Sequence, residues 1–178
     1  MTYLDSNAAE RYCLLRQGDF YFAVAAEQVR EVLPAPQLTV VPDADSVLAG
    51  LFHHRNEFLA VFCPHILTDK CDMNSRTRPT QMIVIERSEG GWGLLVDEVL
   101  GLSALEVCVN SDVGQTDVDV DALWGTATHQ DRVIHVVDAK KLYRLAESEL
   151  RHRWAEPLVP PAKNARHSGT SMMNVNPS

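Results

Sequence analysis

The residues best suited to bind a metal or act as nucleophiles are His53, His54, Cys63, His65 and Cys71. Cysteine and histidine are the usual ligands of zinc. Their spacing contains no Cys-x-x-Cys pair, and the two adjacent histidines would point to opposite faces of a strand. Structural or surface roles are therefore favoured, and a metal- or thiol-dependent sensor using Cys63, His65 and Cys71 is the alternative hypothesis.

Other motifs of enzyme chemistry are incomplete in this sequence. Gly-Gly-Trp-Gly at residues 90–93 lacks the Lys-Ser/Thr of a phosphate-binding loop. Alternating aspartates at residues 117–121 resemble the start of a calcium loop, but the required Gly and Glu do not follow. Cys63 and His65 have no recognisable orienting carboxylate. We therefore expect neither an enzyme nor a bound cofactor.

Two charged residues beside hydrophobic segments could shape a surface groove. Glu31 lies in Val-Arg-Glu-Val and Arg55 lies in His-His-Arg-Asn. Exposed charges are usually solvated. A carboxylate–guanidinium contact between these two residues could instead fix the geometry of a surface groove at a lobe boundary. The sequence favours neither interpretation over the other.

The composition restricts the class of protein. Hydrophobic residues make up 46% of the 178 residues and charged residues 22%, which is typical of a soluble globular protein. The formal net charge of −8 argues against a nucleic-acid partner. Four cysteines are too few for a secreted disulfide framework. No signal peptide or membrane-spanning run is visible, so we expect a cytoplasmic protein that does not insert into the membrane.

The elements that would position these residues are mostly short strands. Apolar runs on both sides of Gln-Gly-Asp at residues 17–19 predict a hairpin. Residues 26–33 fit either a helical turn or a strand, and residues 46–51 are predicted to form a helical turn. Further strands are predicted in the apolar segments that contain residues 38–41, 58–62, 82–86 and 92–96.

The second half of the chain repeats the first. Residues 50–67 align without gaps on residues 125–142, and Gly, His, Val and Leu are identical at four aligned positions. This pattern favours a duplicated β unit. We therefore expect two pseudo-repeated lobes at roughly residues 20–80 and 81–147.

The ends of the chain differ from this β pattern. Apolar residues recur at helical spacing over residues 139–155, after Asp138 as a helix N-cap, and predict one C-terminal helix. Residues 1–10 are predicted to be an N-terminal lead, 11–156 a single domain, and 157–178 a disordered tail. Residues 110–121 are predicted to be a solvated loop.

An ordered set of motifs resembles the CheW family, the adaptors that couple bacterial chemoreceptors to the histidine kinase CheA. The motifs are Val-Arg-Glu-Val at 29–32, Val-Pro at 41–42, Gly-Leu-Phe-His-His-Arg at 50–55, Trp-Gly-Leu-Leu-Val-Asp-Glu-Val at 92–99, and the segments 123–125 and 133–142. The resemblance implies a mainly β fold of two intertwined five-stranded SH3-like β-barrels with a C-terminal α-helix. It also implies a chemoreceptor tip, a CheA-type kinase regulatory domain and other CheW-like proteins as partners.

The resemblance also implies which residues contact the receptor. Val29, Glu31, Gly50 and Arg55 would line the receptor groove. The second-lobe scaffold would comprise Leu94, Val96 and Asp97. Several residues depart from the family pattern: Asn56 replaces a turn Gly, His53 and His54 replace Asn-Leu, Ala60 replaces Pro, and Cys-Pro at 63–64 replaces Asp-Leu. These changes predict a specialised pathway such as surface sensing, twitching or a cyclic-nucleotide output.

Overall fold

Two β-sheets and a C-terminal helix make up the part of the chain that the structure describes. The computed structural model describes residues 10–42, 47–63, 79–109 and 122–155. The elements are β1 (Arg11–Gln17), β2 (Phe20–Ala25), the 3₁₀-helix η1 (Ala26–Gln28), β3 (Val29–Pro34), β4 (Leu48–His54), β5 (Glu57–Phe62), β6 (Gln81–Ile85), β7 (Trp92–Val96), β8 (Glu98–Ala104), β9 (Cys108–Val109), β10 (Leu123–His129), β11 (Arg132–Val137) and α1 (Ala139–Ala155). The mainly β class with one C-terminal helix is confirmed.

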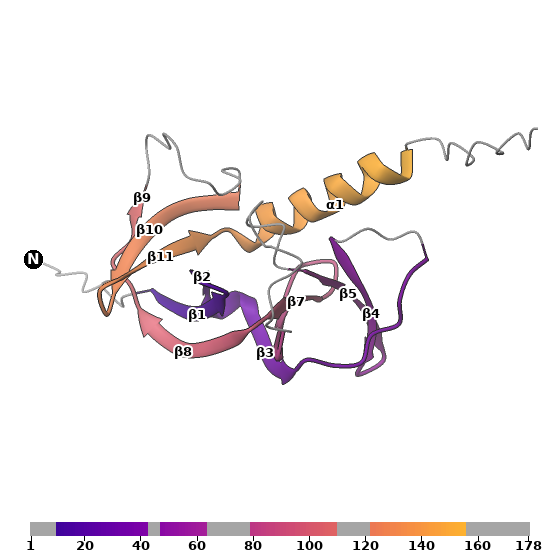
Figure 1. Cartoon of the computed structure of the whole chain (residues 1–178), viewed down its shortest axis with the longest axis horizontal. Helices are drawn as coiled ribbons and strands as arrows, with labels where there is room; N and C mark the ends of the chain where they lie inside the picture. Colours follow the sequence, from indigo (N-terminus) through magenta and orange to yellow (C-terminus); the bar gives the residue numbers. More distant parts are fainter. Residues whose placement is uncertain (1–9, 43–46, 64–78, 110–121, 156–178) are drawn as a thin grey trace, which may run out of the picture.

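The two sheets exchange strands, so each contains both early and late segments of the chain. The first sheet has the order β8-β1-β2-β11-β10-β9, and the second has the order β3-β6-β7-β5-β4. After the β1–β2 hairpin the chain crosses to the second sheet, where β3 pairs with β6. After the β6–β7 hairpin it crosses back, and β8 pairs with β1. This exchange is the predicted intertwining (Figure 1).

The sheets differ from ideal barrels in two respects. The first has six strands rather than five, because the two-residue β9 pairs with β10. In the described part of the chain both strand orders are open, so neither sheet closes by strand pairing into a complete barrel. The lobe limits at residues 20–80 and 81–147 remain predictions.

The β4–β5 and β10–β11 hairpins have the same construction. β4 and β10 have seven residues each, and β5 and β11 have six. Register shifts fall between Leu48 and Gly50 and between Leu123 and Gly125. β5 pairs in parallel with β7, as β11 does with β2. The hairpins therefore match over residues 50–62 and 125–137, as the alignment indicates, while residues 64–67 of the alignment lie outside the described residues.

Local sequence patterns were wrong or undecided at some elements. The helical turn predicted at residues 46–51 is wrong, because residues from Leu48 onward pair along β5 as strand β4. The undecided segment at residues 26–33 contains both elements, because residues 26–28 form the 3₁₀-helix η1 and residues 29–33 lie in strand β3. Residues 38–41 contribute only an isolated bridge between Thr39 and Leu51. The loop at 110–121 and the tail at 157–178, like residues 1–9 of the lead, lie outside the described residues.

The helix α1 completes a core that both sheets share. Asp138 accepts hydrogen bonds from the backbone N–H groups of Lys140 and Lys141, at 2.9 and 3.1 Å, which confirms it as the N-cap. The helix buries four apolar side chains in the same cluster as residues of both sheets: Ala139, Leu142, Ala146 and Leu150. α1 and β8 lie on opposite sides of the molecule (Figure 1). Within the described ranges, no helix combines the length and apolar character needed to span a membrane.

Candidate functional site

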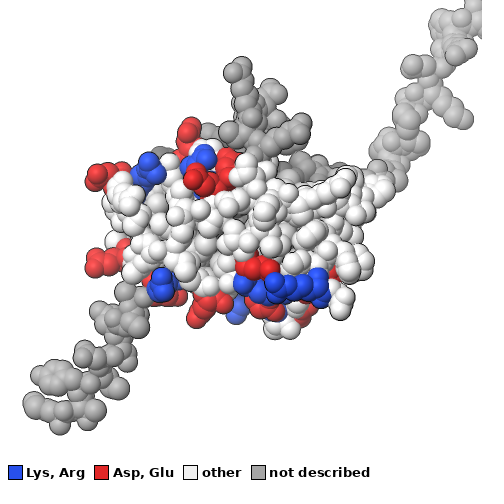
Figure 2. All heavy atoms as spheres, turned by 90° about the horizontal axis from the view of Figure 1, so that it is seen from below, with Lys and Arg blue, Asp and Glu red and all other residues white. Residues whose placement is uncertain are grey.

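A network of charged side chains joins strand β3 to the β4–β5 hairpin. This network is called the ionic cluster and comprises Arg30, Glu31, His54, Arg55, Glu57 and Glu86. Strands β3 and β4 stand at opposite ends of the second sheet's strand order, so the cluster links the two edges of one sheet by side chains. Figure 2 shows Lys and Arg side chains flanked by Asp and Glu on a face that is otherwise largely uncharged.

Glu31 is the centre of the ionic cluster. Its side chain is 15% exposed, and Oε1 lies 2.9 Å from Nε2 of His54 while Oε2 lies 3.1 Å from Nη2 of Arg55. Nε of Arg30 is 3.5 Å from Oε1. The predicted contact between Glu31 and Arg55 therefore forms, within one sheet, and each carboxylate oxygen serves a different hairpin residue. His54, one of the departures from the family pattern, shares this carboxylate.

Arg30 connects the ionic cluster to two further carboxylates. Its guanidinium contacts Glu57 of β5 and lies 3.2 Å from Oε2 of Glu86. The hydrogen bond from Arg30 is the main cause that lowers the pKa of Glu57, and the same bond raises the pKa of Arg30. This contact therefore favours the charged forms of Arg30 and Glu57.

The turn between β4 and β5 presents Arg55 to solvent. Arg55 and Asn56 have φ angles of 45° and 67°, the positive values that two-residue hairpin turns require. Asn is well suited to this region, which explains how the turn forms without the family's Gly, whereas Arg is uncommon there. The Arg55 side chain is 71% exposed although one edge of its guanidinium holds Glu31. Its remaining donors face solvent and can contact a partner.

Gly50 serves a close backbone approach at the other end of β4. A Cβ at this position would lie 2.6 Å from the carbonyl oxygen of Thr39, and the φ of +149° also favours glycine. Thr39 and Leu51 exchange two backbone hydrogen bonds of 2.9 Å across this contact. Val29 begins β3 and packs partly buried against the central core. Of the four predicted groove residues, the structure joins only Glu31 and Arg55 directly.

The predicted scaffold residues are buried where the two sheets meet. Leu94 and Val96 lie in β7 and are about 1% exposed. Asp97, between β7 and β8, accepts a hydrogen bond from the backbone N–H of Gly18 through Oδ2 at 2.8 Å, and this oxygen lies 3.9 Å from Nη1 of Arg16. Its own N–H donates to the carbonyl of Arg16 at 3.1 Å. Asp97 therefore ties the β1–β2 turn to the start of β8.

Exposed apolar side chains on the two exchanged strands were not found by sequence reasoning. Val32 of β3 is 40% exposed and Leu102 of β8 is 55% exposed. No sequence pattern predicted the exposure of either side chain. Val32 and Leu102 occupy equivalent positions in the repeat, and both strands follow a hairpin and end a sheet. This equivalence could have indicated that both side chains are exposed.

The alternative metal or thiol site is only partly within the described residues. Cys63 follows β5, and its backbone N–H donates to the carbonyl of Val47 at 2.9 Å. His65 and Cys71 lie outside the described residues. Among the described residues, no three His, Cys, Asp or Glu side chains are grouped to hold a metal ion. Burial raises the pKa of the Cys13 thiol, which disfavours its reactive thiolate form.

The fold and the site together define a class of protein, a small pair of intertwined β-sheets covered by a C-terminal helix. In its described part, charged clusters connect strands and turns to one another. The model of the CheW-like domain family matches residues 11–147, so the chain belongs to the CheW-like domain family. Members of this family are scaffold proteins of chemotaxis.

A solved structure supports the fold independently. The scaffolding protein TtCheW from Thermoanaerobacter tengcongensis matches with a TM-score of 0.67 and 17% sequence identity. The match covers 76% of this chain and 92% of TtCheW. No curated protein matches the sequence significantly. The resemblance drawn from the motifs is thereby confirmed at the level of family and fold.

Proposed function

We propose that this protein is a non-enzymatic adaptor that couples a methyl-accepting chemoreceptor to a CheA-type histidine kinase. Membership of the CheW-like domain family supports this role. The observation that carries the receptor-binding part is Arg55, an exposed guanidinium held at a hairpin tip by the partly buried Glu31. A side chain fixed before binding loses less conformational entropy when a partner docks.

The receptor surface is proposed to include Val29, Glu31, Gly50 and Arg55. Val32 is an exposed apolar residue on the same strand as Glu31, but adjacent strand residues point to opposite faces, so its side chain is not part of this surface. The exposed cation of Arg55 suits the polar side of an amphipathic helical receptor tip, since helix-in-groove recognition combines apolar anchors with a polar rim. Gly50 contributes by shaping the backbone beneath this surface, and Leu94, Val96 and Asp97 support the fold behind it.

The pathway is proposed to be a specialised one. His54, where the family pattern has Leu, shares the carboxylate of Glu31 with Arg55. The His53 ring packs at an angle of 45° against the ring of Phe58, which is 74% exposed, with ring centroids 4.9 Å apart. These departures lie on and beside the proposed receptor surface, which favours a dedicated receptor and kinase for surface sensing, twitching or a cyclic-nucleotide output. The same proposal places the protein in the cytoplasm, at membrane-bound receptor arrays that also contain other CheW-like proteins.

The test is co-purification of the full chain with the receptor cytoplasmic tip and the kinase regulatory domain from the native cell. Arg55→Asp should reduce receptor capture roughly tenfold, because reversing an interfacial charge removes a contact and adds repulsion. Arg151→Asp is the matched control, since Arg151 is 76% exposed on α1 and contacts only Glu147 within the described chain.

Kinase capture should survive Arg55→Asp, because the kinase is proposed to dock on a different surface. Unchanged capture of both partners by Arg55→Asp would reject the receptor surface. Failure of the unmodified chain to capture either partner would reject the adaptor role itself.

A further inference from the structure

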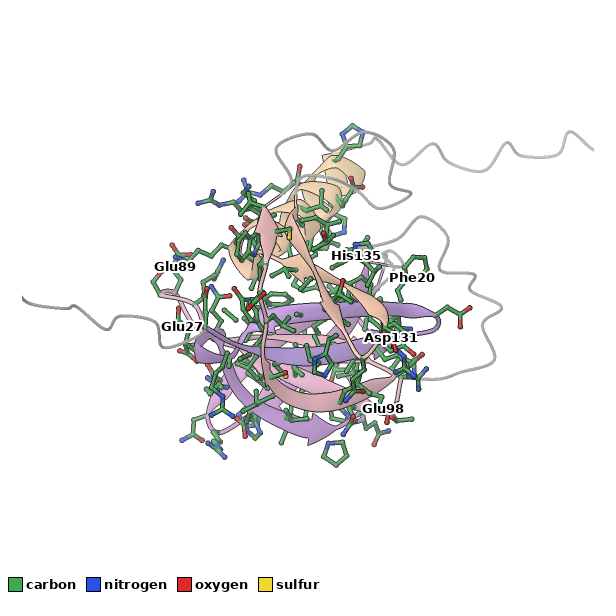
Figure 3. All side chains as sticks on the ribbon, turned by 90° about the vertical axis from the view of Figure 1, so that its left-hand side faces the viewer. Phe20, Glu27, Glu89, Glu98, Asp131 and His135 are labelled. Atoms are coloured by element: carbon green, nitrogen blue, oxygen red, sulfur yellow. The ribbon has the colours of Figure 1, made fainter. Side chains whose placement is uncertain are left out.

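The place in the first sheet that corresponds to the ionic cluster of the second sheet is an open pocket. Strand β8 ends the first sheet as β3 ends the second, and the β10–β11 hairpin corresponds to β4–β5. Between β3 and the β4–β5 turn, the space is occupied by the ionic cluster. Between β8 and the β10–β11 turn lies a pocket of about 360 Å³. Figure 3 shows that hairpin turn, marked by Asp131, above the start of β8, marked by Glu98.

The strand pairings fix the correspondence between β3 and β8. Glu31 pairs with Val84 in β6, and Gly101 pairs with Leu14 in β1. Each strand bulges at the preceding residue, which is Arg30 in β3 and Leu100 in β8. The two side chains that fill the second sheet's space, a guanidinium and a carboxylate, are therefore replaced by leucine and glycine in the first sheet.

The hairpin side of the pocket keeps its polar residues. His129 corresponds to His54, and Arg132 corresponds to Glu57, at the same places in the matched hairpins. His54 contacts the carboxylate of Glu31, and Glu57 contacts Arg30. In the first sheet, no salt bridge of Arg132 is found within the described chain. A histidine and an arginine thus face a space from which the corresponding carboxylate is absent.

The remaining lining sets the chemistry of a ligand. Leu14 and Ile134 form a buried apolar floor, and Leu100 and Leu102 border the opening. The guanidinium of Arg132 lies over the Tyr21 ring, 4.7 Å from its centroid, which orients the cation without neutralising it. Such a lining suits a carboxylate flanked by apolar groups, because the anion can pair with Arg132 while its neighbours cover the leucines.

We infer that this pocket binds an acidic side chain from an extended segment of a partner protein, with apolar residues on both sides of it. An extended segment is favoured because β8 is the terminal strand of its sheet in the described chain, and such an edge can pair with an added strand. The acidic side chain takes the place that the carboxylate of Glu31 occupies in the other sheet. This surface is separate from the ionic cluster, so the inference stands without the adaptor role.

The experiment measures binding of a labelled peptide, Thr-Val-Leu-Glu-Leu-Val-Thr, to the full chain by fluorescence anisotropy. A second peptide with Gln in place of Glu tests the need for the charge. Leu100→Glu places a carboxylate of the chain itself opposite Arg132 and fills the pocket. The resulting Glu–Arg pair would correspond to the Arg30–Glu57 pair of the second sheet with the two charges exchanged. Val133→Glu adds the same charge to the same hairpin, on a 57% exposed residue outside the pocket.

The Glu peptide should bind the unmodified chain and Val133→Glu alike, and bind Leu100→Glu at least roughly tenfold more weakly. The Gln peptide should also bind roughly tenfold more weakly. Equal binding of the two peptides, or equal weakening in both variants, would overturn the inference. It would also be overturned if free 4-methylpentanoate bound as tightly as the peptide, or if sedimentation showed a dimer of the chain that Leu100→Glu abolishes.

Discussion

Asp97 shows how one buried carboxylate can connect the two sheets. It is 5% exposed and holds the N–H of Gly18, so the turn of the first sheet is anchored on the last residue before β8. Asp97→Asn keeps the shape but removes the charge from this bond, and should lower the free energy of unfolding by about 1–3 kcal/mol. Urea denaturation measures the change.

Glu98→Gln is the matched control for that substitution. Glu98 neighbours Asp97, but its side chain is 51% exposed and pairs with Arg16 at the surface. Exposed pairs contribute about 0–1 kcal/mol, so this variant should be nearly as stable as the unmodified chain. Equal losses in the two variants would show that Asp97 acts only as a surface charge.

His135 should make the stability of the protein depend on pH. Burial lowers its pKa below the ordinary value of 6.5, so in mildly acidic solution the unfolded chain binds more protons than the folded one. Stability should therefore fall as the pH drops through about 6.5 toward the lower folded pKa. Urea unfolding at pH 7.5 and 5.5 measures this loss, which should shrink in His135→Leu.

Glu57→Gln is a control for assigning that pH effect to His135. Its pKa is lowered by Arg30, so its contribution is present above the unfolded pKa near 4.5 and is lost as the pH falls through the lower folded value. Glu57→Gln should therefore leave the loss between pH 7.5 and 5.5 unchanged. The assignment to His135 would be contradicted if Glu57→Gln reduced the loss of stability between pH 7.5 and 5.5 while His135→Leu left that loss unchanged.

Sequence reasoning at the residue scale found a pair but missed its neighbours. Glu31 and Arg55 were recognisable as opposite charges beside apolar segments. The contacts of Arg30 and His54 with Glu31 depend on the curvature that brings β3 to the β4–β5 turn, and no local sequence spacing specifies that curvature. Gly50 was assigned to a groove by motif alone, whereas its requirement comes from the Thr39 backbone.

At the element scale, the β10–β11 turn combines a required conformation with a residue unsuited to it. Gln130 has a φ of 50°, where side chains other than Asn, Asp and Gly are disfavoured. Gln130→Asn should raise the free energy of unfolding by about 0.5–1 kcal/mol, and the β-branched Gln130→Val should lower it. Thermal unfolding measures both, and an equal response to the two variants would exclude backbone conformation as the cause.

The strands also show where local patterns stop being informative. Residues 46–51 carry apolar spacing that fits a helical turn, yet pairing with β5 makes residues from Leu48 onward a strand. Tertiary pairing overrides such weak preferences. The local pattern left the segment of β3 undecided and gave no strand prediction for β8. The exchange of both strands between sheets depends on long-range pairing with β6 and β1, which only the family resemblance anticipated.

At the scale of the whole molecule, strand exchange and the shared core imply one cooperative unit. The largest core cluster contains Phe22 of the first sheet, Trp92 of the second sheet and Leu142 of α1. Tyr143 of the same helix packs edge-on against Phe62 at a centroid separation of 5.8 Å. A loss of packing at the helix is therefore expected to reach both sheets rather than the nearer one alone.

Leu142→Ala tests this cooperativity. Leu142 is 1% exposed, and truncating a fully buried leucine costs about 3–5 kcal/mol. If one unit unfolds, amide hydrogen exchange followed by mass spectrometry should show protection falling by the same free energy in β7 and in β11. Leu145→Ala, at a partly buried position on the same helix, should lower both equally but by less. A fall confined to β7 would mean that the sheets open independently, and the exchanged strands β3 and β8 would then act as linkers between two separate units.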